Sequence, residues 1–552
     1  MTDENLQSEL GDNLLEALRK NQVTRRQFLV RASVLGLSTT FAGSLLAACG
    51  GTSSSGASSS PSASASPKKG GTMRVAMVAP TASLDPVTMW DAGAIATVQQ
   101  VCEYLVWVEN DLTLRPVLAE SWTPNGAADT WTFKIRSGVT FNNGQPLTAD
   151  DVVATFKRLS DPKGGSAALS NFKDILVPAG IRAVDQSTVE FGLEKAFVDF
   201  PYLVSSANYN AVVLPANYKG EFDKNAVGTG PFVLKSYSQK QGASFTKNPS
   251  YWQTGLPYLD GVELTYTPDL QAQSLQLQSG AVDMMLASPT QGSQALAADP
   301  NIKIDIQNSP RIVTVAMRVD KTPFTEKGVR QAIAYSLDRP TILQGIFNGN
   351  GLPGADNFFC PLYPTSPQDV VREQDYEKAK QLLADAGYPN GVQITLVCEE
   401  YLEEPQLAQV MQQQCKPAGI DMKIQLMPQS SYYGAGSNGE AAPWLTVPMG
   451  VTGWAARPIA AQYFIPTMYS NGVWNSAHFK SAEFDSLGAK FTSTLDETSR
   501  KQIASDMVTL SMDETPYIIP YFSPAERGMK KTVGNVFASG TDYLDLTQAY
   551  LG

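Results

Sequence analysis

The rhythm of apolar and polar residues changes repeatedly along the chain, and it predicts alternating strands and helices. Residues 114–143 alternate around Trp131, Phe133 and Ile135, which is typical of a β-hairpin with a Gly-rich turn. Residues 91–107 instead place apolar side chains at helical spacing. The same criteria predict further strands at 70–78, 181–193, 312–319, 392–397, 422–426 and 517–522, and further helices at 151–159, 329–337, 375–387, 404–416 and 497–510.

Capping residues support several of these helices. Thr148 precedes a helix with Asp150 and Asp151 in its first turn, where acidic side chains are favoured by the helix dipole. Gly387 ends the helix predicted at 375–387. The strand–helix–strand order at 392–426, with short links, implies an α/β lobe in the second half of the chain.

The segment from Thr24 to Cys49 departs from this pattern, since it has a charged head, a short apolar middle and small residues at its end. These features are typical of a signal peptide, and the apolar run, interrupted by Arg31, falls short of the roughly 20 residues of a spanning helix. Arg25 and Arg26 form a twin-arginine pair, so we expect export of the folded protein. The final Leu-Ala-Ala-Cys resembles a bacterial lipobox, in which Cys49 is acylated and becomes the first mature residue.

Residues 52–67 are dominated by serine, which fills nine of these sixteen positions. Such a stretch cannot form a core, so we expect a flexible tether. About twenty residues of this kind span roughly 25 Å, enough to hold a domain clear of lipid headgroups. We therefore predict a lipoprotein on the outer face of the cytoplasmic membrane, with a folded part that begins near Lys69.

Composition narrows the function further. A net charge of −11 argues against binding to nucleic acid or to anionic lipid. The roughly 480 residues after the tether are too many for one core and predict two or three lobes. His478 is the only histidine, which argues against a histidine-based metal site or catalytic triad, and we expect no cofactor. The four cysteines beyond Cys49 lack metal-binding spacing and form either disulfides, with Cys398 and Cys415 closest in sequence, or buried free thiols.

A long motif at residues 118–159, LAESW…TWTFKIRSGVTFNNGQPLTADDVVATFKRL, resembles the signature of the family 5 extracellular solute-binding proteins. These are the oligopeptide, dipeptide and nickel binders of ABC importers. Six further motifs occur in the family's order: Leu84-Asp85-Pro86, Gly228–Phe232, Asn248–Trp252, VRQAIAYSLDR at 329–339, DYEKAKQLLADAGYP at 375–389, and Gly453-Trp454.

The resemblance covers roughly residues 70–540 and implies an α/β fold with two lobes. This is the type II fold of periplasmic binding proteins (cluster C), with an extra subdomain, a ligand cleft between the lobes, and a hinge of two strands near 312–319 and 517–522. The implied division is signal peptide 1–48, acylated cysteine and tether 49–69, first lobe 70–113, 229–318 and 517–552, its extra subdomain 114–228, and second lobe 319–516.

The resemblance also places a ligand site, with one departure in charge. In the family's peptide binders, an Asp three places after the Gly-Trp tryptophan pairs with the ligand's amino group, whereas Arg457 stands there in this sequence. Arg318 stands near the hinge, where the family usually has Asn. Because a guanidinium binds carboxylate or phosphate through paired hydrogen bonds, we expect an anionic ligand group, or a peptide gripped otherwise than by its amine. The alternative is that Arg457 pairs with an acid of the protein itself.

Backbone on both sides of this site is expected to pair with an extended ligand like an added strand. Aromatic side chains accept varied groups at low entropic cost, so we also expect them in the cleft wall. The candidate ligand contacts are Met89, Trp90, Asp91, Arg318, Tyr432, Tyr433, Gly453, Trp454, Ala455, Arg457, Trp474 and Asn475, with Trp444 as a further aromatic candidate.

A rival class is a secreted penicillin-interacting hydrolase, because Ser244 to Lys247 reads SxxK and Ser206 to Asn208 reads SxN. The SxxK lies in an alternating strand pattern, however, and no KTG follows. We predict instead a monomeric, non-enzymatic receptor that binds a peptide or similar small solute and delivers it to an ABC permease. The alternatives are a receptor for a carboxylate-bearing non-peptide solute gripped by Arg457, and a binding protein that acts as sensor or chaperone.

Overall fold

The computed structural model describes residues 67–81, 84–288, 293–434, 441–540 and 543–552. They belong to one compact unit, Pro67–Gly552. The predicted signal peptide, the lipidation site Cys49 and nearly all of the tether lie outside the described residues. Within the described part of the chain, no helix combines the length and apolar character that crossing a bilayer requires.

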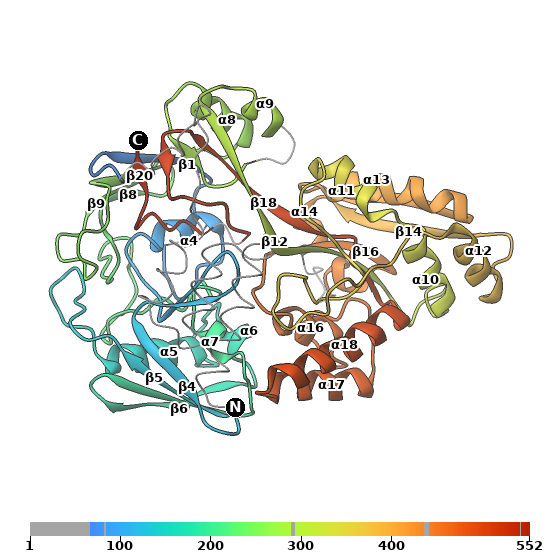
Figure 1. Cartoon of the computed structure of the whole chain (residues 1–552), viewed down its shortest axis with the longest axis horizontal. Coiled ribbons are helices and arrows are strands. Elements are labelled where there is room, and N and C mark those ends of the chain that lie inside the picture. Colours follow the sequence, from blue (N-terminus) through green and yellow to red (C-terminus); the bar gives the residue numbers. More distant parts are fainter. Residues whose placement is uncertain (1–66, 82–83, 289–292, 435–440, 541–542) are drawn as a thin grey trace, which may run out of the picture. The chain divides into compact units, whose positions relative to one another are not determined.

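A twelve-stranded mixed sheet organises this unit (Figure 1). Its two longest strands run antiparallel beside each other, with Ile302 opposite Lys530 and Ile312 opposite Phe522. The strand order is β15 (Ile420–Met427), β14 (Val392–Glu399), β16 (Met449–Trp454), β12 (Ile302–Met317), β18 (Tyr521–Lys530), β11 (Met284–Met285), β1 (Thr72–Met77), β10 (Gly261–Tyr266), β9 (Gly242–Lys247) and β8 (Phe232–Ser238), while β13 (Leu352–Pro353) pairs with β18 and β17 (Tyr517–Ile518) with β12.

Strand β12 begins ten residues earlier than predicted, at Ile302 instead of 312. Ile302, Ile304 and Ile306 alternate with polar residues, but the polar residues 307–309 and Pro310 interrupt this alternation before the predicted strand begins. The structure accommodates this interruption with a shift of register between Gln307 and Arg311, where a proline is tolerated in a ladder. The second half of β12 then pairs with β16, from Ile312 opposite Trp454 onward.

The predicted α/β unit of the second half is confirmed. β14 and β15 are parallel, and α13 (Glu404–Cys415) connects them through the short 3-10 turn at 416–418. Asp375 caps the helix that precedes β14, as predicted, and accepts a 2.9 Å hydrogen bond from the amide of Lys378. Leu343, Leu396 and Leu407 belong to the core beneath this sheet. The other helices around this core are α10 (Lys327–Tyr335), α11 (Arg339–Phe347) and α12 (Tyr376–Asp385).

A separate four-stranded antiparallel sheet contains the predicted hairpin. Trp131, Phe133 and Ile135 are all buried, as their alternation predicted. Thr148 and Asp151 form a reciprocal capping box at the start of the next helix. The strand order is β4 (Ala119–Pro124), β5 (Thr130–Ile135), β7 (Thr188–Leu193) and β6 (Leu176–Asp185), with α5 (Ala149–Ser160), α6 (Leu169–Phe172) and α7 (Phe200–Leu203) in the same region.

The helix predicted at 91–107 is wrong in its second half. α4 covers only Ala92–Val98, and the chain then leads into the short strand β2 (Val106–Val108), which pairs with β3 (Leu114–Pro116). The carbonyls that a longer helix would use internally accept hydrogen bonds from distant amides instead. Those acceptors and donors are Gln100 with Phe232, Val101 with Gly230, and Glu103 with Val213.

Three helices near the C-terminus join the largest core, and only the last matches a predicted element, at 497–510. Phe359 contacts Phe491 at 5.4 Å between ring centroids, and the amide of Val198 donates to the carbonyl of Thr492 at 2.8 Å. These contacts join the helices to segments far apart in sequence. The helices are α16 (Ala461–Met468), α17 (Ala482–Ser493) and α18 (Glu497–Glu514).

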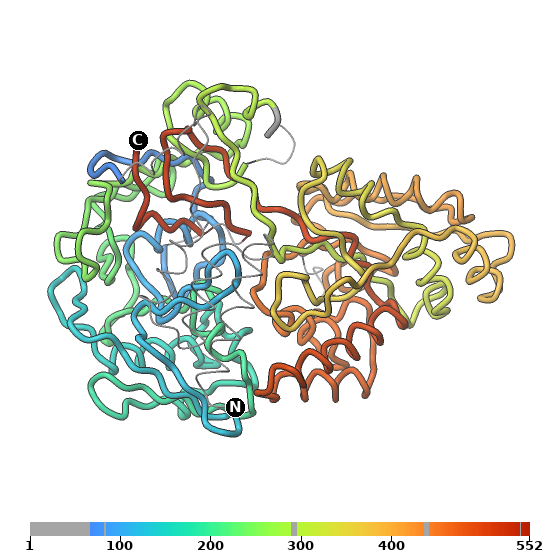
Figure 2. Tube along the Cα trace, viewed as in Figure 1, coloured from blue at the N-terminus to red at the C-terminus, as the bar shows by residue number. Residues whose placement is uncertain are grey.

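The end of the chain returns to the first described segments, as Figure 2 shows in red beside blue. The amide of Leu544 donates to the Gln99 side chain at 3.1 Å, and Gln100 donates to the Leu544 carbonyl at 3.0 Å. The short elements outside the sheets already described are α8 (Leu270–Gln278), α9 (Ser293–Ala297), α14 (Gln429–Tyr432), α15 (Pro443–Thr446) and the pair β19 (Val533–Gly534) with β20 (Tyr550–Leu551).

The structure decides the state of the four cysteines and the arrangement of the SxxK sequence. Cys102, Cys360, Cys398 and Cys415 are all buried free thiols. Ser244 and Lys247 lie on strand β9, as predicted, and each is bonded elsewhere: the serine hydroxyl to Ser236 at 2.6 Å, and the ammonium to the Pro257 carbonyl at 2.6 Å. The SxxK sequence therefore lacks the helical arrangement of a hydrolase.

Candidate ligand-binding site

A series of aromatic rings surrounds the end of β16. Trp454 contacts Trp444 at 6.1 Å and Trp474 at 5.7 Å between centroids. Tyr433 contacts Trp444 at 5.7 Å and Tyr432 at 5.2 Å. The structure thus brings together five predicted aromatic candidates. Tyr432 is fully buried, whereas the other four are half-buried.

The loop after β16 presents Arg457 in a fixed backbone conformation. Its amide donates to the Tyr463 hydroxyl at 3.0 Å, and its carbonyl accepts from the Tyr363 hydroxyl at 2.7 Å. The Tyr463 hydroxyl also lies 2.7 Å from the Pro310 carbonyl and 2.8 Å from that of Ala455. Two tyrosines from outside the loop therefore hold its main chain.

The half-buried guanidinium of Arg457 has no carboxylate partner and no side-chain hydrogen bond among the described residues. Arg457 also acts on Tyr209: burial raises the pKa of this tyrosine hydroxyl, Arg457 acts to lower that pKa, and Asp91 acts to raise it. Tyr209 therefore lies within electrostatic reach of both Arg457 and Asp91. No sequence pattern singled out this tyrosine.

The segment after Leu84-Asp85-Pro86 exposes one predicted contact and buries another. Trp90 is 61% exposed, whereas Met89 is 1% exposed. Asp91 caps α4, accepting from the Ala94 amide at 3.0 Å. The Asn210 side chain donates to the carbonyls of Pro86 and Met89 at 2.8 and 2.9 Å, so it shapes this segment.

Two other predicted contacts have their polar atoms occupied internally. Arg318 forms two 2.7 Å hydrogen bonds with the Asp320 carboxylate and donates to the Thr446 carbonyl at 3.0 Å. These bonds lower the pKa of Asp320 to about 2. Asn475 bonds to the main chain of Tyr469 and Phe479. Both side chains stabilise the structure in this conformation, and they leave Arg457 as the available cation.

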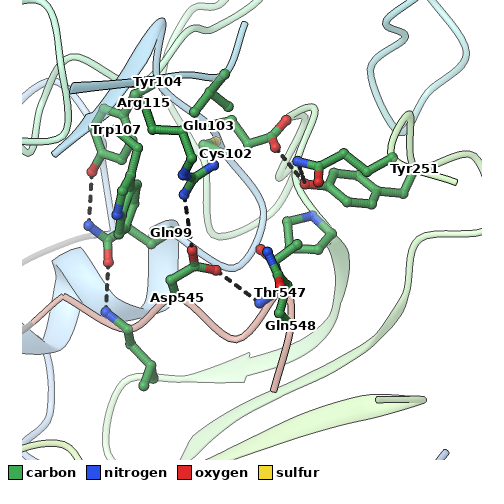
Figure 3. A pocket seen from close by; sticks show the side chains of 14 residues that line it. Gln99, Cys102, Glu103, Tyr104, Trp107, Arg115, Tyr251, Asp545, Thr547 and Gln548 are labelled. Atoms are coloured by element: carbon green, nitrogen blue, oxygen red, sulfur yellow. Dashed lines mark hydrogen bonds and ion pairs between the residues drawn. The ribbon is translucent and has the colours of Figure 1, made fainter. Parts of the chain in front are cut away.

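A polar pocket of about 40 Å³ lies elsewhere, near α4 and the C-terminal segment (Figure 3). Glu103 accepts hydrogen bonds from Tyr251 at 2.7 Å and Trp252 at 2.9 Å, so it anchors the Asn248–Trp252 motif. Arg115 and Asp545 form an ion pair at its edge, 3.6 Å apart. A space of this size holds only a few water molecules. The Asn248–Trp252 motif therefore has a structural role here, since two of its side chains bond to Glu103.

Metal ligands do not gather in the described part of the chain: no group of three or more histidine, cysteine or acidic residues there has the arrangement to hold a metal ion.

Known proteins share the sequence pattern over well over half of this chain. The model of the bacterial extracellular solute-binding proteins, family 5 (middle), matches residues 113–476. The chain belongs to this family. The glutathione-binding protein GsiB of Escherichia coli K12 is 28% identical to it over 460 residues, which cover 80% of this chain and 87% of GsiB.

Solved structures place this solute-binding protein among the type II periplasmic binding proteins. AgaA of A. tumefaciens R10, solved with agropinic acid, is 25% identical with a TM-score of 0.70 over 87% of this chain and 99% of AgaA. DppA of Helicobacter pylori, solved with the peptide STSA, is 22% identical with a TM-score of 0.70 over 88% and 98% of the two chains. The family comprises binding components of ABC importers for peptides or similar solutes.

Proposed function

We propose that this solute-binding protein is a lipid-anchored receptor that captures a small solute outside the cytoplasm and delivers it to an ABC permease. Export by the twin-arginine route and acylation of Cys49 would attach it to the outer face of the membrane. The serine-rich stretch at 52–67 would let the folded unit reach the permease. The receptor acts as a monomer, with the permease and the ligand as its partners.

Ligand capture proceeds by closure of two lobes, with the second lobe at 319–516 and the first built from the remaining folded segments. Ligand that contacts both lobes favours the closed state. Because β12 and β18 run side by side in the central sheet, they are suited to act as the two hinge strands. An ion pair joins segments assigned to different lobes: the guanidinium of Arg500, in the second lobe, lies 2.6 Å from the carboxylate of Asp199, in the extra subdomain of the first.

The ligand is a peptide or similar solute whose anionic group pairs with Arg457. One observation carries this proposal: the Arg457 guanidinium is half-buried beside the aromatic series and has no acid partner among the described residues. A carboxylate would form paired, charge-assisted hydrogen bonds with it. The exposed Trp90 ring is available for stacking, and the amide of the exposed Ala455 is available for strand-like pairing.

A carboxylate-bearing non-peptide solute is the second candidate. The similarity to AgaA favours it, since that protein was solved with agropinic acid, an acid by name, and is 25% identical to this chain. Both candidate ligands carry an anionic group that pairs with Arg457, and they differ only in the rest of the molecule.

Native mass spectrometry of the purified protein tests this proposal. We expect a co-purified small ligand in the wild type and its loss in Arg457→Ala. Arg182→Ala is the matched control, because Arg182 is exposed and pairs with Glu190 on another sheet. A series of bound masses that fragment into short peptides supports a peptide ligand. A single acidic metabolite supports the carboxylate-bearing non-peptide solute. Ligand retained equally in all three proteins would contradict the role of Arg457.

A further inference from the structure

Three glutamates meet at the carboxyl-terminal end of two parallel neighbouring strands. β14 ends at Glu399, and Glu403 and Glu404 stand where the following helix begins. β16 lies beside β14, with Gly450 opposite Val397. The three glutamates are 1%, 4% and 1% exposed. In open α/β sheets, ligands bind at this end of the strands.

The hydrogen-bond partners of these carboxyls are unequal. Glu399 accepts from Tyr433 at 2.6 Å and from Gln429 at 3.0 Å, so both of its oxygens are occupied. Glu403 lies 3.8 Å from the guanidinium of Arg311. Glu404 is different, because neither of its oxygens meets a donor from another described residue. A buried carboxyl of this kind is costly to the fold unless some group completes it.

A second buried group points to the same place. The Tyr521 hydroxyl is fully buried and has no hydrogen-bond partner among the described residues. Burial raises the pKa of this hydroxyl, and the carboxyls of Glu403 and Glu404 raise it further, so Tyr521 lies within electrostatic reach of both. A buried donor on β18 and a buried acceptor on α13, both without a hydrogen-bond partner among the described residues, are thus electrostatically coupled, and buried polar groups of this kind call for a ligand or water that bonds to them.

Glu404 also touches the strand that carries the ligand-binding loop. A Cβ added to Gly453 would lie 2.4 Å from Glu404 Oε1, so only glycine leaves room for this carboxyl. The next residue is Trp454, the centre of the aromatic series. The carboxyl therefore lies against the backbone of the candidate site, and Tyr433, which donates to Glu399, belongs to the same aromatic series.

The charges around Glu404 favour an added cation. Burial, with the carboxyls of Glu403 and Glu399, raises the pKa of Glu404 to about 9, although Arg311 and the main-chain amide of Glu404 act to lower it. Without ligand, Glu404 therefore holds a proton at neutral pH. The titratable groups that face it are Arg311 on β12, Cys398 and Glu399 on β14, Glu403 before α13, Tyr432 and Tyr433 at α14, and Tyr521 on β18.

We propose that Glu404, with Glu399, Glu403 and Tyr521 around it, binds a cationic group of the solute, either a primary ammonium or a guanidinium. This inference rests on the proposed receptor function and defines the substrate as a zwitterion, whose anionic group pairs with Arg457. When the cation enters, Glu404 ionises and its proton passes to solvent. Hydrogen bonds between charged partners are the strong ones, so this pair contributes to selectivity.

Three tripeptide libraries, offered to the full chain and analysed by native mass spectrometry, test the chemistry. All keep a free C-terminal carboxylate. The first has a free amino terminus and no Lys or Arg, the second is N-acetylated with one Lys or Arg, and the third is N-acetylated with neither. We expect retention of the first or the second library, which distinguishes an amino terminus from a side chain, and rejection of the third. Equal retention of the third library, or retention of none, would overturn the inference.

The variant Glu404→Gln keeps the shape of the side chain and removes its ability to ionise. We expect it to weaken binding of the retained library by roughly 10- to 100-fold, the range for a lost hydrogen bond to a charged group. Glu400→Gln is the matched control, since Glu400 is exposed on the same loop. Unchanged binding in Glu404→Gln would overturn the inference. The proposed receptor function would survive that result if Arg457→Ala still lost its ligand.

Calorimetry in two buffers of different ionisation enthalpy provides a readout that a structural role would not produce. At pH 7, binding of the retained library to the wild type should release up to one proton per complex, and its affinity should rise as pH increases from 6 to 8, below the point where an α-amino group loses most of its charge. The Glu404→Gln variant should show neither effect. Equal proton release in both proteins would assign the titration to another group and overturn the inference.

Discussion

The hydroxyl of Tyr463 accepts a hydrogen bond from the main-chain amide of Arg457 at 3.0 Å. The same hydroxyl lies within hydrogen-bond distance of the carbonyls of Pro310 and Ala455. One oxygen from α16 thus joins the end of the ligand-binding loop to strand β12. The position of the guanidinium therefore depends on a side chain that need not touch ligand.

The substitution Tyr463→Phe should lower both stability and ligand affinity. It leaves buried main-chain groups without a partner, which costs about 1–3 kcal/mol of unfolding free energy. Binding should weaken as well, because Arg457 loses the bond that holds its main chain. Urea unfolding and calorimetric titration measure the two effects. Tyr469→Phe is the control, since the Tyr469 hydroxyl has no hydrogen bond to the described residues; equal losses in both variants would contradict this role.

Glu103 should make stability depend on pH. Burial raises its pKa from an ordinary 4.5 to about 7. Between these values the folded protein holds a proton that the unfolded chain has lost, so the unfolding free energy falls as pH rises. The fall is at most about 1.4 kcal/mol per pH unit, and it ends once pH exceeds the folded-state pKa.

Urea unfolding of wild type and Glu103→Gln from pH 4.5 to 7.5 measures this contribution. The variant should lose stability less steeply, so that the difference between the two proteins changes by about 1–3 kcal/mol across the window. Glu194→Gln, at an exposed position, should keep the wild-type slope. Parallel curves for wild type and Glu103→Gln would show that Glu103 has no shifted pKa.

Asp356 should be required for folding of the second half of the chain. Its carboxyl is fully buried and lies 2.7 Å from both Arg339 and Arg372. Asp356→Asn leaves two buried guanidinium groups without a counter-charge, which should lower the unfolding free energy by about 3–5 kcal/mol. Glu377→Gln removes an exposed pair with Lys380 and should leave the urea midpoint unchanged. A similarly small effect of both changes would contradict this account.

Gly228 should not tolerate a methyl group. A Cβ there would lie 2.1 Å from the carbonyl oxygen of Val101, which follows the end of α4 and accepts a hydrogen bond from the Gly230 amide. Gly228→Ala must displace backbone, and we expect a loss of about 1–3 kcal/mol in urea unfolding. Gly126→Ala is the control, since a Cβ at Gly126 meets nothing within 4 Å. Equal midpoints for the two variants would show that the contact with Val101 relaxes freely.

The candidate site divides into a predictable and an unpredictable part. Trp454 and Arg457 stand at fixed offsets within a short motif, so they can be named from the sequence. Tyr209 and Tyr463 carry no motif, and their importance comes from contacts with residues far away in the chain. Arg318 shows the opposite problem: its position suggested a ligand contact, but Asp320, two residues later, takes two of its hydrogen bonds.

The sequence by itself determined the elements whose stability is local. The buried faces of Trp131 and Phe133 follow from alternation, and the caps at Thr148 and Asp375 depend on residues only three positions away. The family was readable for a related reason, because its motifs are short and ordered. Only the tertiary structure decided where α4 ends, since distant amides bond to the carbonyls of the residues that follow it, and only it placed Glu404 against Gly453 without a hydrogen-bond partner among the described residues. Such contacts depend on how segments meet in space, and no local pattern encodes that meeting.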